Sequence, residues 1–236
     1  MESILNLQDV NTFYGKGHIL HGITLEVRAK EIVCLLGRNG VGKTTTLRTI
    51  MGLTPPKSGC IYFHGQDISQ LHDYLIPRLG IGYIPQGRHI FPDLTVKENL
   101  KIGIVTNEVH HKSYDEIFNY FPILEERLNQ HGGTLSGGEQ QMLAIARALV
   151  PNPTLILLDE PSEGLMPKMV KLVGEIIHKI NQTGVSILWV EQKLVTVLEV
   201  AHRVHLISKG KVEYQATPEE LAQNREIQLR YLGVKA

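Results

Sequence analysis

A glycine-rich loop near the start of the chain has the residue types and spacing that grip phosphate groups. Residues 37–44 read Gly-Arg-Asn-Gly-Val-Gly-Lys-Thr and fit the pattern G-x-x-x-x-G-K-[ST] at every position. Glycines allow unusual backbone angles and let backbone N–H groups approach a polyphosphate. Lys43 is expected to neutralise the β- and γ-phosphates of a nucleoside triphosphate, and the Thr44 hydroxyl to bind Mg²⁺. The nucleotide-binding residues predicted in this segment are Gly37, Arg38, Asn39, Gly40, Val41, Gly42, Lys43, Thr44 and Thr45.

Two adjacent carboxylates follow an apolar run much later in the chain. Residues 155–158 are all leucine or isoleucine, and Asp159 and Glu160 come next. An acid at the end of such a strand can hold Mg²⁺, and an acid one residue further can accept a proton from an attacking water. A single acid there would more often be a surface charge, but a pair in a chain with a complete phosphate loop favours catalysis. We therefore predict Asp159 as a metal ligand and Glu160 as the general base.

Strands and helices alternate around these residues. Residues 31–36 form a continuous apolar run that leads into the glycine loop, and residues 45–50 continue as a helix, which argues against a chance glycine turn. Residues 154–158 and 185–190 predict two more buried strands. Between them, Val170, Val173, Ile177 and Ile180 recur at helical spacing. This repetition predicts an α/β fold with a doubly wound, mostly parallel sheet flanked by helices.

Other segments extend this core. Residues 4–7 and 23–27 alternate in hydropathy and predict an antiparallel β-layer at the N-terminal end. Strand signals vanish from about residue 71 to residue 150, where helical patterns dominate. We expect one domain over 1–236, in which 1–70 and 151–236 form the core with its β-layer and 71–150 form a helical insertion.

The composition excludes several classes of protein. Hydrophobic residues make up 42% of the chain and the formal net charge is +0, which predicts an ordinary core and gives no basic surface for nucleic acid. No apolar run approaches the roughly 20 residues that span a bilayer, and the first residues do not form a signal peptide. The protein is therefore expected to be cytosolic. Cys34 is expected to be a buried free thiol, and the adjacent His110 and His111 to lie in a solvated loop rather than bind metal.

A second glycine-rich segment links the chain to a known family. Residues 135–140 read Leu-Ser-Gly-Gly-Glu-Gln and match the signature of ABC transporter ATPases without a mismatch. The order of motifs (aromatic residue, phosphate loop, glutamine, signature, acid pair) also matches over nearly the whole chain. The chain thus resembles this family, which implies a P-loop NTPase core, ATP and Mg²⁺ as ligands, and ATP hydrolysis. The residues that the resemblance assigns to the ATP of an opposite subunit are Ser136, Gly137, Gly138 and Glu139.

The signature also has a physical interpretation. Ser136 and the following amides lie at the start of a predicted helix, so they form an anion site. In the family this site faces the γ-phosphate held by the other subunit, so that two ATP molecules join a head-to-tail dimer and hydrolysis opens it. An ordinary helix cap would explain the serine and one glycine but not the six-residue match.

The resemblance assigns four further positions. Tyr14 corresponds to the aromatic residue that stacks on adenine, although Phe13 could take that role. Gln86 corresponds to the glutamine that reaches Mg²⁺ and the attacking water. Gln192 stands where the family usually has a catalytic histidine, and Met166 where it usually has aspartate. Glutamine can donate a hydrogen bond to the γ-phosphate but cannot become a cation.

Three segments indicate a subfamily of the ABC transporter ATPases. Residues 87–100, 160–165 and 190–192 are similar to the ATPases of branched-chain amino-acid importers and their urea-transporter relatives. The implied function is that of the energy-coupling subunit of an importer, most simply for branched-chain amino acids. The alternatives are a urea or amide importer, a non-transport ABC ATPase and an ATP-binding regulatory module.

The same resemblance implies partners and a location. The partners are a second ABC ATPase subunit, identical or different, integral-membrane permease subunits and, indirectly, an extracytoplasmic solute-binding protein, with no nucleic acid. The location is the cytoplasmic face of the membrane, reached through the permease. Phe91, Pro92 and Leu94 could form an apolar patch that receives a helix of the membrane subunit, or could pack within the helical insertion.

Overall fold

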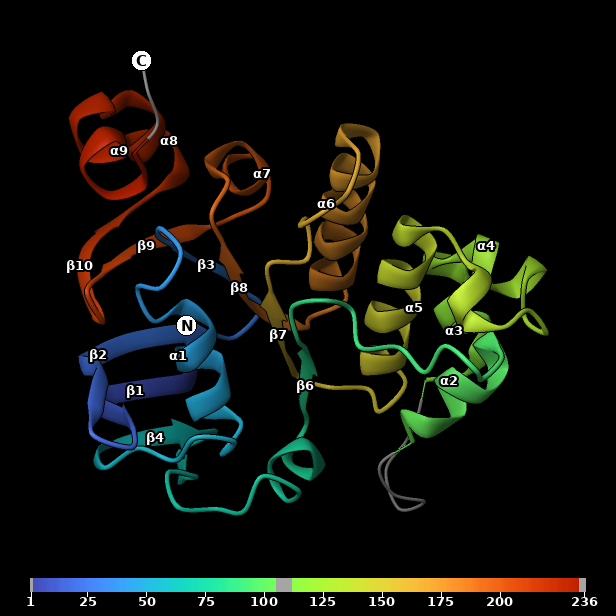
Figure 1. Cartoon of the computed structure of the whole chain (residues 1–236), viewed down its shortest axis with the longest axis horizontal. Helices are drawn as coiled ribbons and strands as arrows, with labels where there is room; N and C mark the ends of the chain where they lie inside the picture. The colour runs from blue at the N-terminus through green and yellow to red at the C-terminus, as the bar shows by residue number, and fades with distance from the viewer. Residues whose placement is uncertain (1, 105–111, 234–236) are drawn as a thin grey trace.

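The computed structural model describes residues 2–104 and 112–233, so that His110 and His111 lie outside the described residues. Two β-sheets organise the fold (Figure 1). The smaller sheet is antiparallel and has the strand order β2-β1-β4-β5. Its strands are β1 (Ser3–Tyr14), β2 (Gly17–Arg28), β4 (Ser58–Phe63) and β5 (Gln66–Asp67). The predicted N-terminal β-layer is therefore present.

The larger sheet has six strands in the order β10-β9-β3-β8-β7-β6. They are β3 (Ile32–Leu36), β6 (Ile81–Ile84), β7 (Leu155–Asp159), β8 (Ser186–Glu191), β9 (Arg203–Ser208) and β10 (Lys211–Ala216). All neighbours are parallel except the β9–β10 hairpin. Every residue of β3, β7 and β8 is buried, as continuous apolar runs predict for strands covered on both faces. The carboxyl ends of these three strands therefore meet at one edge of the sheet.

Helices cover both faces of the large sheet. The α-helices are α1 (Lys43–Ile50), α2 (Val96–Ile102), α3 (Tyr114–Tyr120), α4 (Pro122–Glu126), α5 (Gly137–Leu149), α6 (Pro167–Gln182), α7 (Leu194–Leu198), α8 (Pro218–Gln223) and α9 (Arg225–Leu232). Two short 3-10 helices span Ile76–Leu79 and Gly132–Thr134. Figure 1 shows α2, α3 and α4 gathered beside α5, on the side of the molecule away from α1 and the small sheet. The two apolar cores lie on opposite faces of the large sheet.

Four helices begin with the same local device. In each, a serine or threonine accepts a hydrogen bond from the third helical N–H, and a glutamate at that position bonds back to the capping residue. The pairs are Thr95 with Glu98, Ser113 with Glu116, Ser136 with Glu139, and Thr217 with Glu220. The sequence therefore fixes the start of α5, which is the signature helix.

The helical insertion is shorter than predicted. Residues 81–84 lie in the range where we expected no strand, yet they form β6 and pair in parallel with β7. The reading Ile-Gly-Tyr-Ile is too short to show a strand pattern, and glycine is unfavourable in strands. Gly82 suits the close approach of α5, because a Cβ atom there would lie 3.0 Å from the carbonyl oxygen of Ala148. The boundary at residue 71 was therefore wrong in this part: a 3-10 helix (Ile76–Leu79) and β6 come first, and α-helices begin only at Val96.

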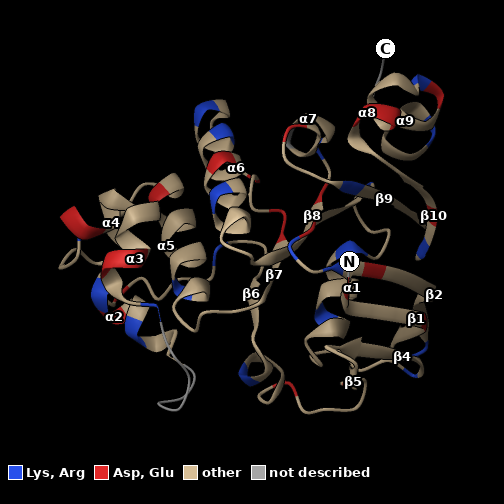
Figure 2. Ribbon diagram, turned by 180° about the vertical axis from the view of Figure 1, so that it is seen from behind, with Lys and Arg blue, Asp and Glu red and all other residues tan. Residues whose placement is uncertain are grey.

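The long helix α6 is amphipathic as predicted. Val173, Ile177 and Ile180 are buried against the core. Its outer face carries lysines interleaved with Glu175, visible as blue and red turns in Figure 2. Among the described residues, no helix combines the length and the apolar content that crossing a bilayer requires.

Cys34 is a free thiol buried in β3, as predicted. Burial raises its pKa, and the nearby charge of Glu191 raises it further. The thiol therefore stays protonated and is unreactive.

Candidate active site

The phosphate loop connects β3 to α1 at the carboxyl edge of the large sheet. Gly40 and Gly42 have φ angles of 77° and 113°, a left-handed region that residues with a Cβ atom rarely adopt. Gly42 is the residue before α1. The N–H groups of the first helical turn have no acceptor within the helix and point back into the loop. The conformation of this loop and helix start fits the predicted backbone cradle for an anion.

Lys43 is held in the centre of the loop by three oxygen atoms. Its Nζ donates to the carbonyl oxygens of Gly37 at 3.0 Å and Arg38 at 3.1 Å. It also forms an ion pair with Oε1 of Glu160 at 3.0 Å. The lysine is only 4% exposed. The carboxylate of the predicted base therefore occupies a position beside Lys43 that the terminal phosphate of ATP would contest.

Thr44 and Asp159 meet from opposite sides of the site. The Thr44 hydroxyl donates to Oδ1 of Asp159 at 3.0 Å, although the two residues are far apart in sequence. The other carboxylate oxygen, Oδ2, is buried and has no hydrogen-bond partner among the residues that the structure describes. A hard cation prefers such oxygen ligands. The unpartnered oxygen beside a hydroxyl therefore fits Mg²⁺, and two of the three predicted ligands, Thr44 and Asp159, lie together.

The environment of Asp159 changes its acidity. Burial raises its pKa to about 6, the hydrogen bond from Thr44 opposes this, and the charge of Glu160 adds to it. The folded chain thus holds this proton more tightly than the unfolded chain, whose value is near 3.8. Asp159 therefore lowers the free energy of unfolding as the pH rises from 3.8 through about 6.

This raised pKa predicts a pH-dependent demand for Mg²⁺. A proton on Asp159 competes with the cation, so the Mg²⁺ concentration for half-maximal ATPase activity is expected to rise about tenfold for each pH unit below 6. Titrations of Mg²⁺ between about pH 5 and pH 7.5 measure it. Asp159→Asn should need more Mg²⁺ at every pH and show no such slope. A slope that survives in this variant would assign the proton to another group.

Glu160 has an unusual backbone conformation. Its φ angle is 47°, which is costly for a residue with a side chain. Its N–H donates to the carbonyl oxygen of Val190 at 2.9 Å, and its own carbonyl oxygen accepts from the N–H of Glu163 at 3.0 Å. These bonds turn the carboxylate away from the strand and towards Lys43.

Gln86 follows β6 and faces the same cleft. Its Nε2 donates to Oε2 of Glu163 at 2.8 Å. The amide group is therefore paired with Glu163 and not with Asp159 in this conformation. The predicted contact of Gln86 with Mg²⁺ and water stays a prediction, and it requires this bond to open.

A cleft of about 440 Å³ joins these groups. Its lining residues are Tyr14, Ile19, Asn39, Gly40, Gly42, Lys43, Thr44, Thr45, Gln86 and Glu160. Tyr14 thus lies on the cleft, whereas the Phe13 ring stacks on His18 with centroids 4.1 Å apart. This geometry favours Tyr14 for the aromatic role that the sequence left open between the two. Ile19 was missed, because it lies at an irregularity of the β1–β2 hairpin, between the pairs Phe13–His18 and Thr12–Leu20, which no sequence pattern reveals.

The signature turn lies outside this cleft. Ser136 is exposed, and neither it nor the next three residues line the cleft. Oε2 of Glu139 accepts from the Ser136 N–H at 2.8 Å, and its other oxygen pairs with Arg127 at 3.1 Å. Arg88 reaches the same helix start and donates to Oε1 of Gln140 at 3.1 Å. The Ser136 turn is therefore free to face another molecule and does not complete the cleft of its own chain.

The two unusual positions lie at the surface. Gln192 directly follows β8 and is exposed, outside the residues that line the cleft. Met166 is 72% exposed and precedes α6. Because β7 and β8 are neighbours, both residues lie near the edge that carries Glu160. Their predicted effects on turnover stay predictions.

Comparison with known proteins decides the family. The family described as "ABC transporter" matches residues 20–163, a segment that contains the phosphate loop, the signature and the acid pair. The chain belongs to the ABC transporter ATPases. It therefore binds and hydrolyses ATP as the nucleotide-binding subunit of a transport system, as its motifs predicted.

Relatives of similar length support this conclusion. The high-affinity branched-chain amino acid transport ATP-binding protein BraG of Pseudomonas aeruginosa is 40% identical, over 98% of this chain and 100% of its own. The probable branched-chain amino acid transport ATP-binding protein LivF of Archaeoglobus fulgidus is 35% identical, over 98% and 99%. The lipopolysaccharide export system ATP-binding protein LptB of Haemophilus influenzae is 36% identical, over 98% of each chain.

Solved structures confirm the P-loop NTPase fold of the ABC cassettes. The ADP conformation of MJ1267, an ATP-binding cassette of an ABC transporter, superposes with a TM-score of 0.85 at 23% identity, over 98% and 99% of the two chains. A dimeric post-hydrolysis state of the cassette MJ0796, bound to ADP and Pi, has a TM-score of 0.81 at 27% identity, over 91% and 98%.

Proposed function

We propose that this chain is the energy-coupling ATPase of an importer for branched-chain amino acids. The observation that carries the proposal is the 40% identity to BraG over essentially the full length of both chains. LivF of Archaeoglobus fulgidus points to the same solute class. The chain would act at the cytoplasmic face of the membrane, held there by permease subunits and supplied with solute through an extracytoplasmic binding protein.

The site residues support a division of roles. Lys43 and the loop amides would hold the phosphates, and the Tyr14 ring would stack on the adenine of ATP. Thr44 and Asp159 would hold Mg²⁺, which supplies charge neutralisation at the phosphates when bound. Glu160 would take the proton of the attacking water once ATP has drawn Lys43 away from it. Apart from Asp159, which lies behind Thr44, the residues named here line the cleft, and the signature turn of a second subunit would complete the site.

A head-to-tail dimer accounts for that turn. The exposed Ser136 lies at the start of the 13-residue helix α5, where free N–H groups favour an anion. The dimeric form of the MJ0796 cassette supports such an assembly. The second ABC subunit would be an identical copy or a related chain.

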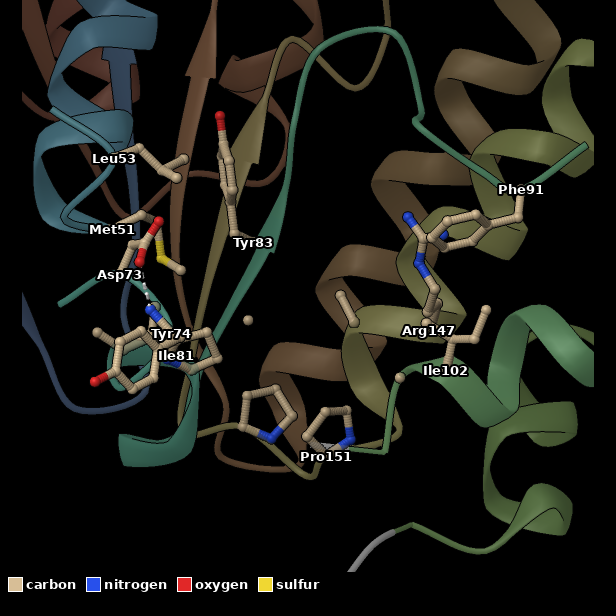
Figure 3. A pocket seen from close by; sticks show the side chains of 15 residues that line it. Met51, Leu53, Asp73, Tyr74, Ile81, Tyr83, Phe91, Ile102, Arg147 and Pro151 are labelled. Carbon is tan, nitrogen blue, oxygen red and sulfur yellow. Dashed lines mark hydrogen bonds between the residues drawn. The ribbon is translucent and has the colours of Figure 1, made fainter. Parts of the chain in front are cut away.

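An apolar cleft supports a membrane partner. Tyr74, Phe91 and Ile102 are exposed by 60%, 44% and 47% and line one cavity of about 450 Å³ (Figure 3). Figure 3 shows Arg147 extending from α5 alongside the Phe91 ring, and its guanidinium carbon lies 5.2 Å from the ring centroid. Phe91 was expected either to receive a helix of the membrane subunit or to pack within the helical insertion. Its exposure favours a surface that receives a helix of the permease.

Replacing Phe91 should therefore uncouple the chain from its partner. Phe91→Asp places a charge in an apolar cleft and is expected to reduce co-purification of the membrane subunits at least about tenfold. Leu229 on α9 is exposed by 42% and offers a matched apolar control, Leu229→Asp, which should keep the complex. ATP binding by the isolated Phe91→Asp chain should not change. Equal recovery of partners with both variants would contradict the docking role.

Gln192 and Met166 suggest that the site on this chain's own phosphate loop is slow. A glutamine cannot supply the positive charge that a histidine can bring to a γ-phosphate. Gln192→His is therefore expected to raise kcat about tenfold, with the KM for ATP unchanged. Steady-state assays of the chain with its partners measure this, and no gain in rate would refute the idea.

One experiment tests the solute and the direction of transport. The chain is affinity-purified from membranes in mild detergent, and the co-purified permease and receptor are assayed for binding of leucine, isoleucine, valine and urea. Binding of the branched-chain amino acids supports the proposal. The identity to LptB makes a lipopolysaccharide exporter the second candidate, and recovery of an exporter complex with no solute receptor would favour it. A receptor specific for urea would move the chain to the alternative importer class.

A further inference from the structure

A buried carboxylate at the end of β8 has no role in the mechanism above. Glu191 is the last residue of that strand and is 2% exposed. It lies in register with Leu36, the last residue of the strand that leads into the phosphate loop. The preceding residue, Val190, pairs with Asp159 and accepts the N–H of Glu160. Glu191 therefore lies between the phosphate loop and the acid pair.

Donors from two different segments occupy its two oxygens. Oε1 accepts from the Ser162 hydroxyl in a very close contact and from the Ser162 N–H at 3.3 Å. Oε2 accepts from the N–H of Gln192 at 2.9 Å and, at the longer distance of 3.4 Å, from that of Lys193. One side chain thus ties the turn after Glu160 to the loop that carries Gln192.

The chemistry of the group suits this bridge. An ionised carboxylate only accepts hydrogen bonds, has about four acceptor positions, and forms stronger bonds than a neutral group. All four groups that contact this carboxylate are donors: the hydroxyl and N–H of Ser162 and the N–H groups of Gln192 and Lys193. A buried carboxylate without them would be unfavourable, so the two segments and the side chain hold one another in place.

The hydrogen bonds of Glu191 stabilise the unusual backbone conformation at Glu160. A residue with the left-handed φ of Glu160 keeps that conformation only when its surroundings fix it. Ser162 belongs to the turn that Glu160 begins, in which the Glu160 carbonyl oxygen accepts from Glu163. Fixing Ser162 therefore fixes the direction of the Glu160 carboxylate.

We propose that Glu191 is a positioning residue for ATP hydrolysis, which holds the Glu160 turn and the Gln192 loop as one unit. The inference rests on the proposed role of Glu160 as general base. In the part of the chain that the structure describes, the hydrogen bonds of the Glu191 carboxylate go to Ser162, Gln192 and Lys193 and not to the phosphate loop, so its effect should fall on the chemical step and not on ATP binding.

The test variant is Glu191→Gln, which keeps the volume of the side chain. An amide has one accepting oxygen and one NH₂ group, so in either orientation the NH₂ faces the donors of one segment. We expect kcat to fall about tenfold or more and the KM for ATP to change less than about threefold. The matched control is Glu213→Gln, an exposed glutamate on β10, which should leave both constants unchanged. A variant with unchanged kcat, or with KM rising in step with any loss of kcat, overturns the proposal.

A second variant covers the case in which Glu191→Gln does not fold. Ser162→Ala removes one donor and keeps the N–H, so kcat should fall about threefold or more at constant KM. Unchanged kcat here overturns the proposal. Where both variants fold, the double variant should be no slower than Glu191→Gln alone, because the two changes break one bridge. Additive losses would overturn it.

A parallel assay of Glu160→Gln separates the positioning role of Glu191 from the proposed role of Glu160 as general base. If that variant loses turnover while Glu191→Gln does not, only the positioning role fails. If Glu160→Gln keeps normal turnover, the proposed base is wrong and the positioning role falls with it.

Discussion

Replacing Glu160 by glutamine is expected to lower kcat for ATP hydrolysis by about 10²–10⁴-fold, the usual contribution of a general base. Glutamine cannot take a proton from water, but it has nearly the same shape. The wild-type chain must also break the 3.0 Å ion pair between Lys43 and Glu160 before a phosphate can approach the lysine. The variant has no such pair to break, so its affinity for ATP should be equal or higher.

The combined result should be an ATP-loaded dimer that does not open. Size-exclusion chromatography with Mg-ATP and phosphate-release assays measure the two properties. Glu175→Gln is the matched control, since that glutamate is exposed on α6, and it should hydrolyse ATP normally. Normal phosphate release by Glu160→Gln would refute the role of Glu160. If Glu160→Gln binds ATP but stays monomeric, the arrangement in which two subunits share each ATP would be refuted instead.

Replacing Lys43 by methionine is expected to weaken ATP binding by about 100-fold or more. The lysine is the buried cation at the phosphate end of the cleft, and methionine preserves its length without the charge. The change also leaves the Glu160 carboxylate unpaired, which should cost about 3 kcal/mol in the free energy of unfolding. Equilibrium binding of a fluorescent ATP analogue and chemical denaturation measure these effects.

A double variant separates the two effects of Lys43. In Lys43→Met with Glu160→Gln, the orphan charge is gone, so most of the lost stability should return. ATP binding should stay weak, because the phosphates still lack their cation. Recovery of ATP binding in the double variant would mean that loss of the lysine acts through misfolding of the loop and not through phosphate contact.

Much of the architecture could be predicted because its signals are local. The run before residue 37 is apolar at every position except Glu31, and it leads into a loop whose glycines have the required φ angles. Parallel pairing of such runs was predictable, but their order in the sheet was not, because every buried apolar run presents the same pattern to its neighbours. β6 could not be predicted, because four residues with a central glycine carry no periodicity and become a strand only through pairing with β7.

The candidate site was predictable in its residue types but not in its contacts. Thr44 in the first turn of α1 and Asp159 at the end of β7 meet because β3, which leads through the phosphate loop into α1, and β7 end at the same edge of the sheet. The bond between Gln86 and Glu163 joins two loops, and no spacing rule relates them. Glu191 was missed for a similar reason: a glutamate that ends an apolar strand looks like a surface charge until the four surrounding donors are seen.

The capping box at the start of α5 has a consequence for selectivity in the cell. The Ser136 hydroxyl already accepts from the Glu139 N–H, and the Glu139 carboxylate places negative charge beside the turn. Arg127 balances that carboxylate, and with the Ser136 and Glu139 N–H groups already bonded, mainly the N–H groups of Gly137 and Gly138 are left for an anion. We therefore expect a lone copy to bind dissolved inorganic phosphate only weakly. A phosphoryl group that is already fixed on a partner's phosphate loop would meet the same N–H groups without first having to be captured from solution.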